Sequence, residues 1–297
     1  MPAEIAIVLN SRSGSAPRQA ELARILEVAG VVADIHSVPV ERERAGQWIG
    51  GLANQYETLV AAGGDGTVSS VAAAAAKAGK TLGVIPVGTL NHFARDAGIP
   101  VVLEQAIVVL AAGHTRSLDA GVVNDRIFIN NASIGAYPRM VWERKQAGQR
   151  GLPRPVAHLL AVVDTWLELS WITVRLSVDG RELVRRSPFV VVGNNEYEVE
   201  GMQFGKRATL TAGRLSLYVA PDSGRLDGVA LIARALVGRL KQSDKFEAWL
   251  ASSIAIDMTK REIAVALDGE IHVLDAPLRF SVKPGALNVI VPAEREG

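Results

Sequence analysis

The sequence contains no cysteine, and this absence excludes several kinds of chemistry at once. A chain without thiols forms no disulfide, has no thiol nucleophile and offers no thiolate ligand to a metal ion. It also lacks a charge excess of either sign, with 32 Lys and Arg against 31 Asp and Glu. A nucleic-acid-binding protein usually shows a strong basic excess, so we expect no nucleic-acid partner. The missing cysteine fits a cytoplasmic protein.

Long hydrophobic runs are absent as well. A membrane-spanning helix needs about 18 or more uncharged apolar residues, and the longest apolar region, 156–174, contains His158, Asp164 and Glu168. No basic stretch precedes the first apolar run, so we predict no signal peptide. With 297 residues the chain is longer than one hydrophobic core usually organises, and we expect two domains.

The first of these, residues 1–121, alternates short β-branched runs with alanine-rich stretches. The pattern predicts strands at 5–9, 31–37, 58–62 and 81–85, and helices at 16–29, 41–53 and 68–78. Strand and helix in alternation indicate an α/β domain, with a parallel sheet covered by helices on both faces. Ligands bind such sheets at the carboxyl ends of the strands.

Residues 122–297 follow a different pattern and predict a β-rich antiparallel domain, whose last strand is free to return to the first domain. Turn signals such as Asp179-Gly180 and Asp268-Gly269 separate short strands. The expected strands are 122–130, 171–178, 189–192, 214–219, 254–258, 262–267, 271–274 and 278–282, with helices at 156–169 and 227–250.

The stretch Gly63-Gly64-Asp65-Gly66-Thr67 follows a predicted strand and opens a helix. It is not a P-loop, which needs a lysine, and it is not a dinucleotide fingerprint, because Ser69 stands where a glycine is required. Glycines let a backbone approach a phosphate, and Thr67 can cap the helix or bond a phosphate oxygen. Asp65 beside a phosphate makes sense with a divalent cation between them. The alternative is a tight turn with an aspartate cap.

Two more polar strand ends accompany this turn. Residues 86–96 follow another predicted strand and contain Thr89 and Asn91, and residues 10–14 follow the first strand. Because the carboxyl ends of parallel strands share one edge of a sheet, the three segments predict a nucleotide site there.

These segments resemble the diacylglycerol kinase catalytic-domain family, which includes bacterial lipid kinases and sphingosine and ceramide kinases. Further segments match in the same order along nearly the whole chain: Asn130-Asn131-Ala132-Ser133-Ile134-Gly135, Gly193-Asn194-Asn195 and Leu267-Asp268-Gly269-Glu270. The resemblance implies an NAD-kinase-like α/β domain, a β-rich domain and ATP in the cleft between them. The nucleotide contacts it implies are Asn10, Ser13, Gly14, Gly63, Gly64, Asp65, Gly66, Thr67, Val68, Ser69, Ser70, Thr89 and Asn91.

As catalytic residues the resemblance implies Asp65, Asp268 and Glu270. Asp65 acts on the phosphates through Mg²⁺, and the segment of Asp268 and Glu270 supplies the base for the acceptor hydroxyl. Carboxylates two apart in an extended segment point to the same side, so we expect both to serve one site. The alternative for this segment is a plain hairpin turn.

The sequence departs from the family pattern at several positions. His92 stands where relatives often have aspartate, and Ser11 stands where they usually have proline. Ala212 replaces the aspartate with which many bacterial lipid kinases hold a structural Mg²⁺, so we expect that metal site to be lost. We hypothesise that Lys206 or Arg207 supplies the positive charge in its place.

A membrane contact is the remaining expectation. Segment 139–154 is basic, and segment 156–174 is apolar and contains Trp166 and Trp171, a combination that suits an anionic membrane surface. A core helix after a solvated loop explains the segment equally well. With the membrane contact, the expected location is the cytoplasm, peripherally on the inner face of the membrane. The sequence leaves open whether the protein forms a homodimer.

The sequence thus predicts an ATP- and Mg²⁺-dependent kinase that phosphorylates a hydroxyl of diacylglycerol or a related lipid. A second interpretation is an NAD kinase, but the segment from Thr89 to Ala94 matches the form found in lipid kinases and argues against it. A nucleotide- or lipid-binding regulator with weak catalysis is a third, motivated by Ala212 and His92. Monoacylglycerol, sphingoid bases, ceramide, undecaprenol and phosphatidylglycerol stay open as acceptors, as does GTP in place of ATP.

Overall fold

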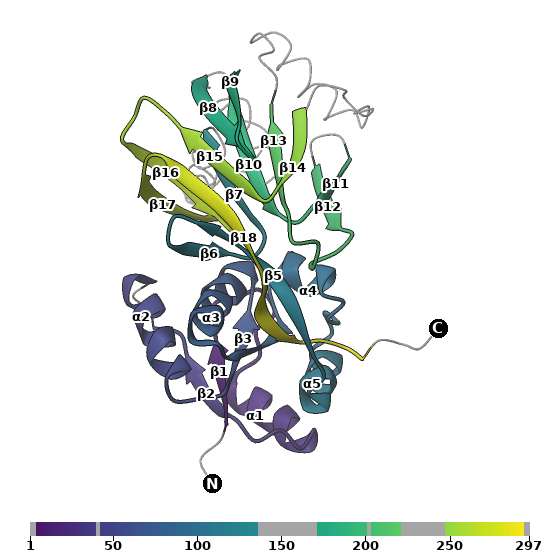
Figure 1. The fold of residues 1–297 in the computed structure, drawn as a ribbon. Coiled ribbons are helices and arrows are strands. Elements are labelled where there is room, and N and C mark those ends of the chain that lie inside the picture. The colour runs from purple at the N-terminus through teal and green to yellow at the C-terminus, as the bar shows by residue number, and fades with distance from the viewer. Residues whose placement is uncertain (1–3, 40–41, 136–170, 201–202, 221–246, 294–297) are drawn as a thin grey trace, which may run out of the picture.

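The computed structural model describes residues 4–39, 42–135, 171–200, 203–220 and 247–293. An α/β half with a parallel sheet is followed by a half built from antiparallel strands (Figure 1). The predicted fold class is therefore confirmed.

Four parallel strands form one end of the larger sheet, in the order β2-β1-β3-β4. They are β1 (Ile5–Leu9), β2 (Asp34–Ser37), β3 (Thr58–Gly63) and β4 (Thr81–Pro86). Side chains of β1 alternate between two core clusters: Ala6 and Val8 lie in one, and Ile7 and Leu9 in the other. A strand buried on both faces needs apolar residues throughout, which explains its sequence.

Helices cover both faces of this parallel sheet. Two of them, α1 (Gln19–Val28) and α5 (Leu103–Ala112), pack on the face of Ile7 and Leu9. The opposite face is covered by α2 (Arg42–Ala53), α3 (Asp65–Ala78) and the short α4 (His92–Asp96).

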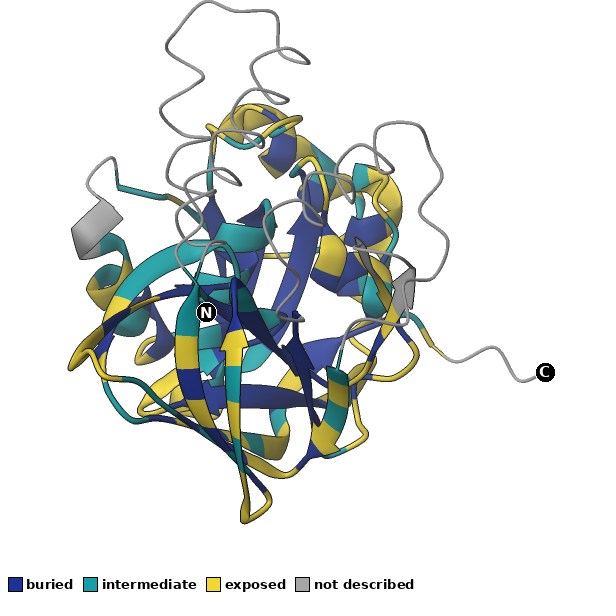
Figure 2. Cartoon of the chain, turned by 90° about the horizontal axis from the view of Figure 1, so that it is seen from above, coloured by how far each residue is buried: buried dark blue, intermediate teal, exposed yellow. Residues whose placement is uncertain are grey.

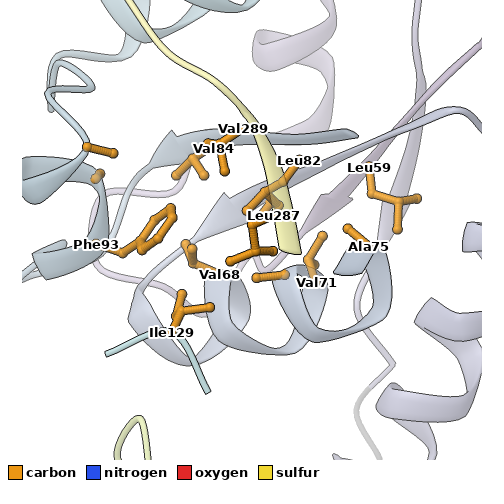
Figure 3. Close-up of a cluster of buried hydrophobic side chains, with 14 of the residues drawn as sticks. Leu59, Val68, Val71, Ala75, Leu82, Val84, Phe93, Ile129, Leu287 and Val289 are labelled. Atoms are coloured by element: carbon orange, nitrogen blue, oxygen red, sulfur yellow. The ribbon is translucent and has the colours of Figure 1, made fainter. Parts of the chain in front are cut away.

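The core on the α3 side also includes residues from the second half of the chain. Figure 3 shows Val68 and Val71 of α3 in one cluster with Phe93 of α4, Ile129 and Leu287. Residues far apart in the sequence thus fix the first turns of α3 and α4, the helices that begin at the predicted nucleotide site.

The antiparallel half is a sandwich of two sheets with a separate hairpin. Its strands are β5 (Thr115–Val123), β6 (Arg126–Phe128), β7 (Asn131–Gly135), β8 (Ile172–Val178), β9 (Arg181–Ser187), β10 (Phe189–Asn194), β11 (Tyr197–Glu200), β12 (Gln203–Arg207), β13 (Leu215–Val219), β14 (Glu247–Ala251), β15 (Ser253–Asp257), β16 (Glu262–Leu267), β17 (Glu270–Asp275) and β18 (Leu278–Ile290). One sheet has the order β14-β13-β10-β7-β16-β17, and the larger sheet continues from β4 through β18, β15, β8 and β9. Figure 2 shows buried strands inside and exposed residues at the hairpin tips.

The long strand β18 connects the two halves, as Figure 1 shows by its yellow ribbon beside β5. At one end Ser281 pairs with Ser253 of β15, and at the other Asn288 pairs with Thr81 of β4. Its register against β5 shifts between Lys283 and Leu287. One continuous hydrogen-bonded sheet therefore runs through both halves, and the predicted division between residues 121 and 122 falls within β5.

Several element boundaries were predicted wrongly. Helix α3 begins at Asp65 rather than at residue 68, because Gly64 already accepts the first helical hydrogen bonds. The end of the expected helix 227–250 is β14, which pairs with β13, so cross-strand pairing overrides helical periodicity there. The expected strand 122–130 is interrupted by a turn at Asn124, whose φ is 53°. Helix α5 and strands β7, β9, β11, β12 and β14 were not predicted.

The expected helix 156–169, most of 227–250 and the basic segment 139–154 lie outside the described residues.

Candidate active site

Three strand-to-helix connections meet at the carboxyl edge of the parallel sheet. Asn10, after β1, donates from Nδ2 to the Thr67 hydroxyl at 3.0 Å. The Ser13 hydroxyl accepts a hydrogen bond from the Gly64 backbone amide at 3.3 Å. The backbone amide of Ser15 donates to the carbonyl of Val87, after β4, at 3.1 Å. The three predicted polar strand ends are thus brought together.

Glycine is required where the second and third connections touch. A Cβ atom on Gly88 would lie 2.4 Å from the Cα of Gly64, closer than any real Cβ contact. The backbones of the two loops therefore touch directly, and any side chain at Gly88 would push them apart.

Asp65 occupies the first turn of α3, after Gly64 at the N-cap position. Its Oδ1 atom is buried and has no hydrogen-bond partner within the described ranges. Buried carboxylate oxygens are normally hydrogen-bonded, so an orphaned one at the partly exposed start of a helix fits a ligand atom for a cation.

The other predicted nucleotide contacts differ in what their side chains are free to do. Thr89 is exposed in its loop. Asn91 is 7% exposed, and its amide group is engaged by Gly88 of its own loop, accepting from the backbone amide at 3.0 Å and donating to the carbonyl at 2.9 Å. Val68 belongs to the core, and the Ser70 hydroxyl donates to the carbonyl of Gly66 at 2.9 Å. Asn91 thus holds its own loop in shape, whereas Val68 and Ser70 belong to the body of α3.

The segment of Asp268 and Glu270 is the tight turn between β16 and β17. Asp268 and Gly269 have φ values of 47° and 84°, and Leu267 pairs with Glu270. The expectation that both carboxylates point to the same side of an extended segment is wrong, because Asp268 lies in the left-handed region of a two-residue turn.

The Asp268 carboxylate is enclosed by hydrogen-bond donors. It accepts from the backbone amides of Ile129, Asn130 and Asn131 at 2.9, 2.8 and 3.1 Å. The Ser69 hydroxyl, on the first turns of α3, donates to it at 2.5 Å. Burial raises the pKa of Asp268, while the hydrogen bonds from Ser69 and the three amides oppose that rise. All donors favour the carboxylate form, so Asp268 ties the turn to α3.

Glu270 is half-buried and faces the start of α3. A Cβ atom on Gly66 would lie 3.4 Å from Glu270 Oε1, so the glutamate carboxylate reaches the helix turn that begins with Asp65. The structure thus brings Glu270, from the second half of the chain, against the first turn of α3, the turn that also contains Asp65.

Four residues that hold the site together were not predicted as site residues, although Asn130, Asn194 and Asp96 lie in the segments that carry the resemblance. The resemblance singled out the positions of Asn130 and Asn194 but assigned no role to either side chain. Arg207 and Asp96 form an ion pair of 2.7 Å with side chains 0% and 6% exposed. Although the sequence singled out both Arg207 and the segment that ends at Asp96, no local pattern indicates that these two residues pair.

The surroundings of Ala212 contain a carboxylate that is already engaged. Asp119 is buried and accepts from the backbone amides of Gly213 at 2.7 Å and Gly285 at 3.0 Å, while Ala212 donates its amide to Asn195 Oδ1 at 3.0 Å. Nowhere in the described ranges do three or more His, Cys, Asp or Glu side chains group as metal ligands would.

The fold and the meeting of glycine-bearing strand ends with two carboxylates define a class of nucleotide-dependent phosphotransferase. The sequence pattern of the diacylglycerol kinase catalytic domain matches residues 4–123, and that of the YegS C-terminal NAD kinase beta sandwich-like domain matches residues 140–291. The chain belongs to the diacylglycerol kinase catalytic-domain family, as the sequence predicted.

Individual relatives agree with this membership. A Pseudomonas aeruginosa protein named "Probable lipid kinase YegS-like" is 31% identical over 82% of this chain and 79% of its own length. A Staphylococcus epidermidis diacylglycerol kinase is 34% identical over 47% of this chain and 42% of its own. The solved structure of a diacylglycerol kinase from Bacillus anthracis has a TM-score of 0.68 at 20% identity, covers 97% of both chains and shares the fold.

Proposed function

We propose that this protein is an ATP-dependent lipid kinase, which transfers the γ-phosphoryl group to a hydroxyl of diacylglycerol or a related lipid. The observation that supports it most directly is the approach of Glu270 to the helix turn of Asp65, beside three glycine-bearing strand ends. The names of the relatives point to the same class of acceptor.

Glu270 is the proposed general base. It takes the proton of the lipid hydroxyl while the hydroxyl oxygen bonds to the γ-phosphorus and the bond from that phosphorus to the β–γ bridging oxygen breaks, releasing ADP. Asp268 does not act on the substrate in this scheme, because its carboxylate is engaged by Ser69 and the amides of residues 129–131. It positions Glu270.

Asp65 is the proposed contact to Mg²⁺, because its buried Oδ1 atom lacks a hydrogen-bond partner in the described part of the chain. Mg²⁺ bound with ATP would neutralise charge on the transferring phosphate. The backbone amides at the start of α3 would face the same phosphates. Thr89, Ser13 and Gly14 lie around this point, and Asn10 and Asn91 hold its loops in place.

The acceptor is expected at a membrane surface, on the cytoplasmic side where ATP is available. No helix within the described ranges combines the length and hydrophobicity needed to cross a bilayer. A peripheral contact is proposed because the lipid acceptor lies at the bilayer surface.

The test is transfer of labelled γ-phosphate from ATP, with Mg²⁺, into a panel of pure lipids. Wild-type protein is compared with Asp65→Asn, Glu270→Gln and the control Glu182→Gln, an exposed glutamate on β9. Label in one lipid class, lost in the first two variants and kept in the control, is the expected result. ATP binding without transfer to any lipid or to NAD would instead favour a binding protein, the reading that Ala212 motivated.

A further inference from the structure

Arg207, at the end of β12, is fully enclosed and makes contacts to four other elements. Nε donates to Asp96 Oδ2 of α4 at 2.7 Å, and Nη2 donates to Asn130 Oδ1 at 2.8 Å. Nη1 donates to the carbonyls of Ile129 at 2.6 Å and Asn194 at 3.2 Å. The guanidinium also lies 5.3 Å from the centre of the Tyr197 ring.

The contacts of Arg207 fix the connection between β6 and β7 from one side. The Ile129 carbonyl accepts from Arg207 and, at 3.1 Å, from Asn194 Nδ2. On the other side, the amides of residues 129–131 all donate to the Asp268 carboxylate. Holding the Ile129 carbonyl in one direction fixes the direction of the Asn130 amide, the middle one of the three, because the two groups share one planar peptide unit. We call residues 129–131 the amide cradle.

The cradle connects Arg207 to the reacting groups. Asp268 sits in the cradle and is followed, after Gly269, by Glu270, which reaches Gly66. Through Asp96, the guanidinium also holds α4, the helix that follows the glycine-bearing loop after β4. One side chain therefore joins the nucleotide half of the site to the half that supplies the base.

We propose that Arg207, paired with Asp96, is a positioning residue for phosphoryl transfer, which sets the amide cradle and thereby the place of Glu270. The inference rests on the proposed function for its effect on activity. Its structural part, the dependence of the cradle on Arg207, stands without it.

Lysine cannot replace arginine in this position. The guanidinium serves four separate acceptor groups with donors held in one plane, whereas a lysine ammonium is a single point charge that cannot reach them together. A displacement of about 1 Å at a reacting group can lower a rate by about 100-fold. Arg207→Lys keeps the charge and so isolates the geometry.

A matched control exists at the outer edge of the sandwich. Arg185 of β9 donates to both carboxylate oxygens of Glu247 of β14 at 2.8–3.0 Å, and lies 6.0 Å from the Trp249 ring. It is also an arginine with a carboxylate and an aromatic ring, but its side chain is 33% exposed. Arg185→Lys makes the same change of chemistry away from the site.

The experiment measures lipid phosphorylation and amide hydrogen exchange in wild type, Arg207→Lys and Arg185→Lys. We expect Arg207→Lys to lower kcat by about 10- to 100-fold, with KM for ATP within about threefold of wild type. The backbone amides of residues 129–131 should exchange faster in this variant. Arg185→Lys should leave both properties unchanged.

Unchanged exchange at residues 129–131 in a folded Arg207→Lys protein would overturn the inference, as would equal effects of the two variants. Faster exchange in a wild-type protein that phosphorylates nothing would leave the cradle established and reject the proposed function. If Arg207→Lys does not fold, Asp96→Asn replaces it, since asparagine keeps the shape of aspartate and weakens only the hold on Arg207. The same two readouts then apply, with a smaller loss of kcat.

Discussion

Two hairpins of the antiparallel half close on the same dipeptide and have different surroundings. Asp179-Gly180 joins β8 to β9, with φ values of 45° and 85°, and Asp268-Gly269 joins β16 to β17, with 47° and 84°. The first aspartate is exposed and accepts from the amides of Ser252 and Ser253 at 2.9–3.2 Å. The second is enclosed by the amide cradle and Ser69.

The comparison separates what a dipeptide does locally from what it does in the fold. Asp-Gly favours the positive φ values of a two-residue hairpin in both places. Asp268-Gly269 therefore forms a hairpin turn, and a functional role for the neighbouring Glu270 is compatible with that turn. Only the second turn lies against α3, so only there does the next residue, Glu270, face the edge of the sheet where we propose that the nucleotide binds.

The largest expected difference between the hairpins is in catalysis. Glu270→Gln removes the proposed base and should lower kcat by about 10²–10⁴-fold, the usual contribution of general base catalysis. Glu182→Gln changes an exposed residue of the other hairpin and should therefore alter kcat by less than about twofold, which is within the error of the assay. Steady-state transfer of labelled phosphate to lipid measures both. Comparable losses in both variants would remove the distinction between the hairpins.

A smaller effect is expected on stability. Asparagine tolerates the left-handed region as aspartate does, so Asp268→Asn changes only the carboxylate. Its NH₂ group would face backbone amide donors, and the free energy of unfolding should fall by about 2–3 kcal/mol. Asp179→Asn, whose carboxylate is exposed, should cost less than about 1 kcal/mol. Urea unfolding gives both values, and an equal cost would contradict the enclosed setting of Asp268.

Removing the link between the turn and α3 should have an intermediate effect on activity and little effect on the fold. Ser69→Ala deletes one hydroxyl donor to Asp268, and such a bond to a charged group contributes about 1.5–3 kcal/mol. We expect kcat to fall by about tenfold, because Asp268 keeps the three amides and Glu270 moves only slightly. Ser253→Ala, whose hydroxyl donates to the Asp179 carboxylate of the other hairpin at 3.3 Å, is the control. A Ser69→Ala enzyme with full activity would show that the link is dispensable.

The smallest effect concerns pH. Burial, followed by nearby Arg126, lowers the pKa of His272 on β17 below its ordinary value, while Glu270 and Asp268 partly oppose the shift. As pH falls below about 6.5, His272 binds a proton in the unfolded chain more readily than in the folded protein. Its contribution to the free energy of unfolding is therefore fully present above that pH and is lost as pH falls further.

The variant His272→Gln should therefore show a shallower loss of stability between pH 7 and pH 5, by at most about one proton in slope. Leu183 occupies the corresponding place in the other hairpin and does not titrate. Urea unfolding at several pH values measures the slope, and an unchanged slope in the variant would exclude a contribution from His272.

Much of the α/β half was predictable because its signals are local. Continuous apolar runs such as Ile5–Leu9 follow from burial on both faces, and glycines at strand ends follow from close backbone approach. The antiparallel half was less predictable, since β14 carries a sequence compatible with a helix until β13 pairs with it. Of Lys206 and Arg207, the two residues hypothesised to supply charge near Ala212, Arg207 forms an ion pair with Asp96, a partner that no local pattern indicates.

The sequence by itself determined the family, the order of the two halves and which acidic residues, Asp65, Asp268 and Glu270, are candidates for the site. Each of these can be recognised within a short segment of neighbouring residues. Tertiary structure alone decided that Asp268 holds the turn while Glu270 faces the site, and that Arg207 joins α4 to the amide cradle. These roles depend on the direction of side chains and amides contributed by segments more than 100 residues apart, and hydrogen bonding at such separations is fixed only when the sheets have formed.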